Sequence, residues 1–175
     1  MGFLFSLFSK SSDAQPIPKS IYDFKVKALD ESVINFASFK GKKILIVNTA
    51  SKCGYTPQYK NLEALHQRYK DQLVIVGFPA NNFLWQEPGD NATIAEFCQK
   101  NYGVSFVMAA KISVKGNDMA PIYQWLTQKK YNHNSNSSVK WNFQKYLLDE
   151  KGNLIQMFSP GVDPLDAAII QAIEK

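Results

Sequence analysis

The chain has 175 residues, of which 45% are hydrophobic and 20% are charged, and its formal net charge is +5. This balance is typical of one globular domain with a buried core. The lysines are scattered, with only pairs such as Lys42–Lys43, whereas a nucleic-acid surface needs a dense basic stripe, so no nucleic-acid binding is expected. No apolar run of about eighteen residues is present, so no transmembrane helix is predicted.

Residues 1–20 are predicted to form a flexible N-terminal tail, and residues 21–175 the domain. The start of the tail is apolar but short, and it lacks the basic region of a secretory signal. Met1-Gly2-x-x-x-Ser6 fits the myristoylation pattern, so a weak membrane-surface anchor is an alternative to a loosely docked tail. Residues 9–20 are polar with two prolines, as expected of a linker.

The first half of the domain alternates strands with a helix. Residues 24–28 and 33–36 predict a short hairpin. Residues 43–49 and 73–78 contain continuous apolar runs, which are typical of strands buried on both faces of a parallel sheet. Between these runs, residues 56–70 predict an amphipathic helix, because apolar side chains recur there every three or four residues. Strand, helix and strand then form one right-handed crossover unit.

The second half contains three further helices. One is predicted over residues 93–101, with Asp90 or Asn91 as its cap and Gly103 as its stop. A short helix opens at Pro121 and is expected to end at the pair Lys129–Lys130. A final helix with a regular apolar face is expected to start at Asp163-Pro164.

Three further strands are expected between and after these helices. One is predicted over residues 111–114. Residues 143–148 and 154–158 flank Asp149-Glu150-Lys151-Gly152-Asn153, which indicates the turn of a β-hairpin. The complete order predicts an α/β domain in which helices flank a central mixed β-sheet, the arrangement of the thioredoxin fold.

The chain has two cysteines, Cys53 and Cys98, which are too few for a disulfide scaffold. No C-x-x-C or H-x-x-x-H spacing is present, so neither a metal nor another cofactor is expected. Cys53 directly follows the strongest predicted strand and precedes the first helix. Free backbone N–H groups and the helix dipole there lower the pKa of a thiol and favour the nucleophilic thiolate. The alternative is a small buried cysteine that fills the junction between strand and helix.

Three segments together resemble the glutathione peroxidase family: residues 48–58, residues 77–89 and Lys140-Trp141-Asn142-Phe143. The similarity runs from about Ser20 to the C-terminus. The resemblance implies a thioredoxin-like fold and an enzyme that reduces hydrogen peroxide and organic or lipid hydroperoxides. It also implies a catalytic tetrad of Cys53, Gln86, Trp141 and Asn142.

These residue types suit the reaction that the resemblance implies. Attack of a thiolate on a peroxide spreads negative charge over sulfur and both oxygens. The amides of Gln86 and Asn142 and the indole of Trp141 are neutral N–H donors for that charge. A bound water or the thiol's own proton is expected to protonate the leaving oxygen. Taken singly, Trp141 could also be a core residue, Gln86 a loop residue and Asn142 a turn cap.

The segment around Cys98 resembles the part of thioredoxin-dependent members that carries the resolving cysteine. The implied cycle oxidises Cys53 to a sulfenic acid, forms a Cys53–Cys98 disulfide, and returns to the dithiol by exchange with thioredoxin. No basic site for glutathione is recognisable, so glutathione is the less favoured reductant. The alternative for Cys98 is a packed apolar thiol.

The resemblance also bears on assembly, location and the wider role of the protein. The loop of residues 131–139 is short, as in monomeric members of the family, and a reducing cytoplasm is the expected location. An alternative function is a peroxide sensor that relays oxidation to a partner protein. A thioredoxin-like binding module without activity is a third possibility.

One stretch departs from the family pattern. The usual Asn-Gln-Phe-Gly is here Asn81-Asn82-Phe83-Leu84, and Trp85 follows. Leucine does not readily adopt a positive φ, so the loop is expected either to follow a different path or to carry strain. Trp85 could add an apolar wall beside the peroxide.

Overall fold

The computed structural model describes residues 16–175 of the chain. The apolar start of the N-terminal tail and its myristoylation pattern lie outside these residues. The strands are β1 (Lys25–Lys27), β2 (Val33–Asn35), β3 (Lys43–Thr49), β4 (Leu73–Pro79), β5 (Val107–Met108), β6 (Lys145–Leu148) and β7 (Leu154–Phe158). The α-helices are α1 (Gln58–Tyr69), α2 (Asn91–Tyr102), α3 (Pro121–Thr127), α4 (Lys129–Asn132) and α5 (Ala167–Glu174), and two short 3-10 helices are η1 (Ile21–Asp23) and η2 (Phe36–Phe39).

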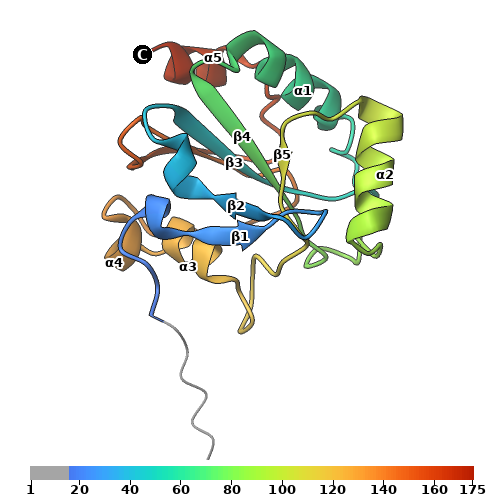
Figure 1. Ribbon diagram of the computed structural model, residues 1–175, viewed down its shortest axis with the longest axis horizontal. Coiled ribbons are helices and arrows are strands. Elements are labelled where there is room, and N and C mark those ends of the chain that lie inside the picture. Colours follow the sequence, from blue (N-terminus) through green and yellow to red (C-terminus); the bar gives the residue numbers. More distant parts are fainter. Residues whose placement is uncertain (1–15) are drawn as a thin grey trace, which may run out of the picture.

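A five-stranded mixed sheet with the order β5-β4-β3-β6-β7 forms the centre of the domain (Figure 1). β3 pairs in parallel with β4 and antiparallel with β6, and α1 connects β3 to β4. All seven residues of β3 are buried, which explains its continuous apolar run. The predicted central strands, the crossover unit and both hairpins are confirmed.

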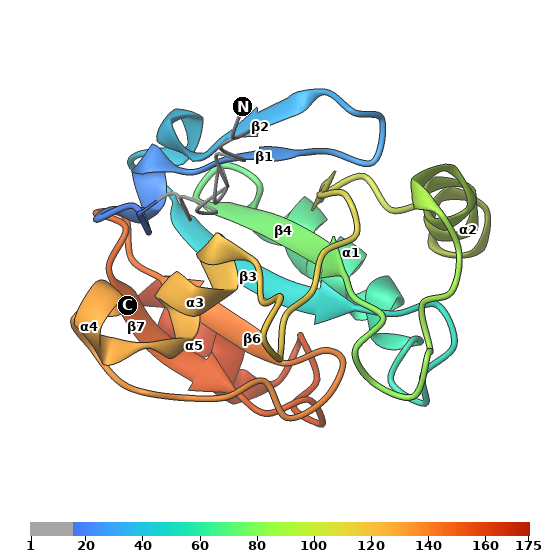
Figure 2. The same cartoon turned by 90° about the horizontal axis from the view of Figure 1, so that it is seen from below.

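The two faces of the sheet carry separate apolar clusters, because successive side chains of a strand point to opposite faces. Ile44 and Ile46 join the cluster that packs against the β1–β2 hairpin and α3. Leu45 and Val47 join the cluster that packs against α1, α2 and α5. In Figure 1, α1 and α5 lie above the sheet and α3 and α4 below it, and both ribbon views place α2 at one edge of the domain (Figure 2).

Helix α2 has well-formed ends. The side chain of Asp90 accepts a hydrogen bond from the N–H of Thr93 at 2.8 Å, as an N-cap does. Gly103 ends the helix in the left-handed region with φ +59°, and its N–H donates to the carbonyl of Gln99. The predicted cap at Asp90 and the predicted stop at Gly103 are confirmed.

The predicted strand over residues 111–114 is wrong. The strand of this region is β5, which pairs with β4 through residues 107 and 108. The N–H groups of Lys111 and Val114 donate instead to the side-chain oxygens of Asn91 and Asn82. The N–H of Ile112 still donates to the carbonyl of Pro79 at the end of β4, but with side chains binding its neighbours the segment is extended without forming a strand.

Two helix boundaries also differ from the expectation. The helix that opens at Pro121 ends at Thr127, before the lysine pair, and Lys129 begins the separate short helix α4. The last helix starts at Ala167 and not at residue 163, because the side chain of Asp166 caps it by accepting from the N–H of Ala168. Asp163 caps a turn instead, through the N–H of Leu165.

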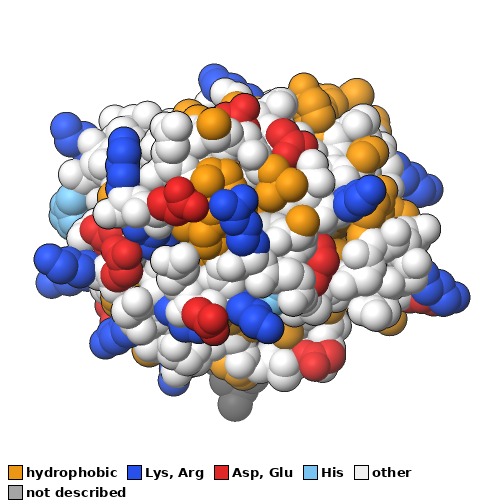
Figure 3. All heavy atoms as spheres, turned by 90° about the horizontal axis from the view of Figure 1, so that it is seen from above, with side chains coloured by type: hydrophobic (Ala, Val, Ile, Leu, Met, Phe, Trp, Pro, Cys, Tyr) orange, Lys and Arg blue, Asp and Glu red, His pale blue; other side chains and the backbone are white. Residues whose placement is uncertain are grey.

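The end of the predicted tail that is described, residues 16–20, meets the domain at two points. The carbonyl of Lys19 accepts a hydrogen bond from the indole of Trp125 at 3.4 Å, and Ser20 caps η1. Among residues 16–175, no helix is long and apolar enough to cross a bilayer. Figure 3 shows basic and acidic side chains interspersed on one face of the domain.

Candidate active site

Cys53 lies in the loop between β3 and α1, with its side chain 8% exposed. Its Sγ accepts a hydrogen bond from the N–H of Tyr55 at 3.3 Å. Such a donor lowers the cost of a negative charge on sulfur. Helix α1 begins only at Gln58, with Pro57 at its N-cap, so the turn before the helix supplies this donor. The hydrogen bond to the sulfur therefore does not come from the first turn of α1.

Thr56 holds this turn closed. Its hydroxyl accepts from the N–H of Cys53 at 2.9 Å and donates to the carbonyl of Ala50 at 2.8 Å, and its own N–H donates to the carbonyl of Cys53. This role of Thr56 was not predicted from the sequence. A hydroxyl residue three positions after Cys53 was the signal for it, because such side chains commonly bond to nearby backbone groups.

Gln86 and Asn142 are in direct contact although 56 residues separate them. The amide Nδ2 of Asn142 donates to Oε1 of Gln86 at 2.9 Å, and Asn142 is fully buried. The carbonyl of Gln86 accepts from the N–H of Lys52 at 3.0 Å. The structure therefore brings both amides to the loop that carries Cys53.

Trp141 belongs to the same end of the sheet. Its carbonyl accepts from the side-chain amide of Asn48 at 3.0 Å, and the carbonyl of Asn48 accepts from the N–H of Phe143. Asn48 is part of β3, which leads directly into the loop of Cys53. The Trp141 ring packs 5.3 Å from the ring of Phe83, between centroids, and it also touches the apolar cluster that contains Cys53.

Several polar groups of this region have no protein partner. Among residues 16–175, Nε2 of Gln86 and the indole N–H of Trp141 donate to no protein acceptor, and Oδ1 of Asn142 is buried without a partner. Buried polar groups are normally paired, so the partnerless Oδ1 of Asn142 is unusual, whereas Gln86 and Trp141 are half-buried and their donors are open to solvent or to a ligand. Two N–H donors thus remain available beside the loop of Cys53.

The loop before Gln86 carries the expected backbone strain. Leu84 and Trp85 both lie in the left-handed region, with φ +49° and +51°, and they are 68% and 77% exposed. Non-glycine residues adopt this conformation at a cost, and such strain often occurs at functional sites. The ring of Trp85 faces mainly solvent, whereas Gln86 behind it keeps its contact with Asn142.

The strain at Leu84 leads to a stability prediction. We expect Leu84→Gly to raise the free energy of unfolding by about 0.5–1 kcal/mol, because the left-handed conformation costs leucine about 1–2 kcal/mol and the freedom of glycine in the unfolded chain offsets part of that gain. Urea denaturation measures the change. Leu165→Gly is the matched control, because Leu165 is also an exposed leucine but has no positive φ. In this variant the free energy of unfolding should fall. Equal losses in both variants would contradict the prediction.

A buried carboxyl group, which the sequence did not predict, lies next to Gln86. Glu87 is 1% exposed, and desolvation raises its pKa, although Ser51 and the charges of Lys111 and Lys52 act in the opposite direction. Its Oε2 has no hydrogen-bond partner among residues 16–175. Glu87 lines a cavity of about 330 Å³ between the loop of Cys53 and α2. Its position directly after Gln86 was the feature of the sequence that could have indicated a place near the active site.

Cys98 lies on the buried face of α2 and is 3% exposed. Burial raises the pKa of its thiol to about 11, so this thiol is protonated at neutral pH. Tyr59 of α1 lies close enough to affect this pKa, although the Tyr59 hydroxyl makes no hydrogen bond of normal geometry with residues 16–175. Cys53 and Cys98 are both free thiols.

Comparisons with known proteins agree with this arrangement. Residues 21–127 match the family model described as glutathione peroxidase. The "Glutathione peroxidase-like peroxiredoxin gpx1" of Schizosaccharomyces pombe is 50% identical over 139 residues, which cover 79% of this chain and 87% of that protein. The chain belongs to the glutathione peroxidase family. It is therefore a thiol peroxidase, as the resemblance implied.

Solved structures support both the family and the fold. The crystal structure of "T. cruzi GPX1" superposes with a TM-score of 0.66 at 31% identity, covering 88% of this chain and 93% of that one. A thioredoxin family protein from Chlorobium tepidum superposes with a TM-score of 0.60 at 16% identity, and the match covers 93% of this chain and 99% of that one. The second likeness concerns the fold alone, and it confirms the predicted thioredoxin-like architecture of this glutathione peroxidase.

Proposed function

We propose that Cys53 is the residue of this glutathione peroxidase that attacks the hydroperoxide. Its thiolate forms a bond to the terminal peroxide oxygen while the O–O bond breaks, which leaves a sulfenic acid on Cys53 and releases water or an alcohol after protonation. The observation that carries the proposal is the contact between Gln86 and Asn142, which a backbone hydrogen bond from Lys52 links to the loop of Cys53.

Gln86, Trp141 and Asn142 complete the proposed catalytic tetrad. Their N–H groups stabilise the charge that develops on the departing oxygen, and as neutral donors they need no proton transfer to do so. The proton for the leaving oxygen comes from a bound water or is the one that the Cys53 thiol releases when it ionises, held nearby until the O–O bond breaks. The partnerless donors of Gln86 and Trp141 support this role, since neither is used within the described part of the protein.

Cys98 is the proposed resolving residue. Its sulfur attacks the sulfur of the Cys53 sulfenic acid, forms the disulfide and releases water. A disulfide requires Cα atoms within about 7 Å, and because Cys98 is buried in an intact helix, we expect α2 to unwind partly during turnover. Hydrogen exchange that finds α2 fully protected in the oxidised protein would count against this step.

Thioredoxin is the proposed reductant of the Cys53–Cys98 disulfide. A second thiol in the chain supports it, because an internal disulfide is a substrate for a dithiol protein. The fission-yeast relative is named as a peroxiredoxin, which agrees with a thiol protein as reductant. A monomer in the reducing cytoplasm, where both cysteines return to the thiol state, completes the proposal.

A coupled assay tests the choice of reductant. NADPH consumption is followed with hydrogen peroxide or a lipid hydroperoxide, and either thioredoxin with its reductase or glutathione with its reductase is supplied. We expect turnover with thioredoxin and much slower turnover with glutathione. Faster turnover with glutathione would overturn the proposed partner but not the peroxidase activity.

Asn142→Ala tests the proposed donors. We expect the rate constant for oxidation of Cys53 to fall by about 10²-fold, comparable with the loss of one oxyanion-hole donor. Stopped-flow oxidation of the reduced protein measures it. Asn132→Ala is the matched control, because Asn132 is also buried, but its amide donates to the carbonyls of Leu126 and Ser135 near α4 and to none of the proposed tetrad residues. An unchanged rate constant in Asn142→Ala would remove Asn142 from the tetrad.

A further inference from the structure

Lys145 is fully buried, which is rare for a lysine without a charged partner. Four oxygen atoms surround its Nζ: Oε1 of Gln58 and the carbonyls of Phe143 and Val162, each at 2.7 Å, and the carbonyl of Pro160 at 3.2 Å. Among residues 16–175, no carboxylate lies within ion-pair distance of Nζ. The proposed mechanism has not used this residue.

Two of the four oxygen atoms around Lys145 come from segments next to the active site, and the other two come from the connection between β7 and α5. Phe143 directly follows Asn142 and has φ +67°, so Lys145 binds the carbonyl of a strained residue next to the tetrad. Gln58 is the first residue of α1, and its N–H donates to the carbonyl of Tyr55. Tyr55 in turn donates its N–H to Sγ of Cys53. Lys145 therefore lies between the segment of Asn142 and the turn of Cys53.

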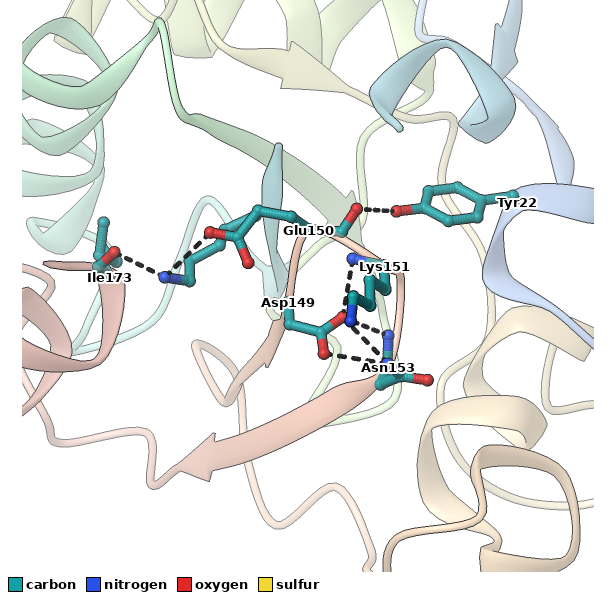
Figure 4. A network of polar contacts seen from close by, with 7 residues as sticks. Tyr22, Asp149, Glu150, Lys151, Asn153 and Ile173 are labelled. Atoms are coloured by element: carbon teal, nitrogen blue, oxygen red, sulfur yellow. Dashed lines mark hydrogen bonds and ion pairs between the residues drawn. The ribbon is translucent and has the colours of Figure 1, made fainter. Parts of the chain in front are cut away.

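A second buried lysine, Lys43, differs from Lys145 because it forms an ion pair with a carboxylate. Nζ of Lys43 lies 2.9 Å from the carbonyl of Ile173 and 3.2 Å from a carboxylate oxygen of Glu150 (Figure 4). Lys43 is the first residue of β3, whereas Cys53 follows the other end of that strand. One buried lysine is thus paired with a carboxylate, and the lysine beside the active site is not.

A buried ammonium group without a carboxylate in direct contact is costly, and four oxygen acceptors and the more distant Asp163 offset only part of that cost. A thiolate at Cys53 would supply the missing negative charge, and an opposite charge nearby favours the ionised form of a thiol. We propose that Lys145 is a positioning residue that supplies the buried positive charge favouring the thiolate of Cys53. Through the carbonyl of Phe143, it also holds the segment that carries Asn142.

Other ionisable groups near the two residues are few. Asp163 is the charged group that acts on Lys145, and Lys52, Tyr55 and Glu87 flank the loop of Cys53. Burial lowers the pKa of Lys145 to about 7, and Asp163 opposes this shift. Under the proposal, a thiolate at Cys53 and the ammonium of Lys145 stabilise each other equally, because linkage is reciprocal.

The test measures the pH dependence of Cys53 alkylation by iodoacetamide in a Cys98→Ser background, where Cys53 is the only thiol. We expect Lys145→Met to raise the midpoint of the profile by about one pH unit. Below the midpoint, alkylation should then slow by about tenfold. Lys43→Met removes the other buried lysine and should leave the midpoint unchanged. An unchanged midpoint in folded Lys145→Met would overturn the proposal.

Two further measurements keep the proposal testable if Lys145→Met does not fold. Lys145→Gln retains hydrogen-bond donors without the charge, and the same rise in the midpoint is expected. In a protein that carries an intact Lys145, Cys53→Ala should lower the titration midpoint of the Lys145 ammonium, followed by NMR of its Nζ. If the titration midpoint of Lys145 is the same in Cys53→Ala and in the wild type, the proposed coupling between the two residues is refuted.

This inference rests on the proposed role of Cys53, and the two can fail separately. If Cys53 reacts rapidly with peroxide but its alkylation midpoint does not depend on Lys145, only the inference fails. If Cys53 does not react with peroxide in the wild-type chain, the proposed function fails, whatever the alkylation profile shows.

Discussion

Cys53→Ser is expected to reduce peroxidase activity by at least about 10³-fold with any peroxide and any reductant. The hydroxyl of serine is hardly ionised at neutral pH, so the covalent step has no nucleophile. The variant should fold normally, because Cys53 makes a single hydrogen bond through sulfur and the contacts of Thr56 use backbone atoms of residue 53. The NADPH-coupled assay measures the loss, and circular dichroism confirms the fold.

Cys98→Ser is the matched control for this first prediction. It also removes one thiol, but it leaves the attacking residue and the proposed tetrad in place. A single stoichiometric oxidation by peroxide should therefore survive in Cys98→Ser and be absent in Cys53→Ser. Activity of Cys53→Ser close to that of the wild type would end the proposal that Cys53 is the peroxidatic residue.

Cys98→Ser should itself lose nearly all thioredoxin-linked turnover, which is the second large effect. Without Cys98 the sulfenic acid at Cys53 cannot form the internal disulfide that thioredoxin reduces. The first oxidation should keep its rate constant, because Cys98 is buried in α2 and bonds to none of the tetrad residues within the described chain. Steady-state turnover and stopped-flow oxidation separate the two effects.

Cys98→Ala distinguishes chemistry from packing in this second prediction. If Cys98 only fills the apolar cluster of α1 and α2, both variants should keep turnover and differ only in stability. If Cys98 resolves the sulfenic acid, both should lose turnover equally. Unchanged thioredoxin-linked turnover would remove the resolving role and leave the peroxidatic role of Cys53 intact.

Much of the fold could be predicted because its central strands have an unambiguous pattern. The apolar run of β3 is buried on both faces, and no surface strand would carry it. Residues 111–114 show why other strands are harder to predict. Their alternation of polar and apolar residues is the same in a sheet strand and in an extended loop, and only the distant side chains of Asn82 and Asn91 decide between them. The start of α5 was missed because Asp163 and Asp166 are both suitable caps.

The candidate site could be predicted only in part. Periodicity placed Cys53 after a buried strand, but the meeting of Gln86 with Asn142 came from a family resemblance, because local patterns do not report contacts across 56 residues. The buried charges were missed for a physical reason. Glu87 and Lys145 belong to residue types that are normally exposed, and their burial depends on how loops and strands pack around them.

Trapping of the sulfenic acid tests the central claim most directly. Reduced Cys98→Ser is treated with one equivalent of hydrogen peroxide in the presence of dimedone, which reacts with sulfenic acids, and the modified residue is located by peptide mass spectrometry. The proposed mechanism predicts a dimedone adduct on Cys53 whose final amount matches the peroxide consumed. Peroxide consumption at the wild-type rate without an adduct on Cys53 would contradict it.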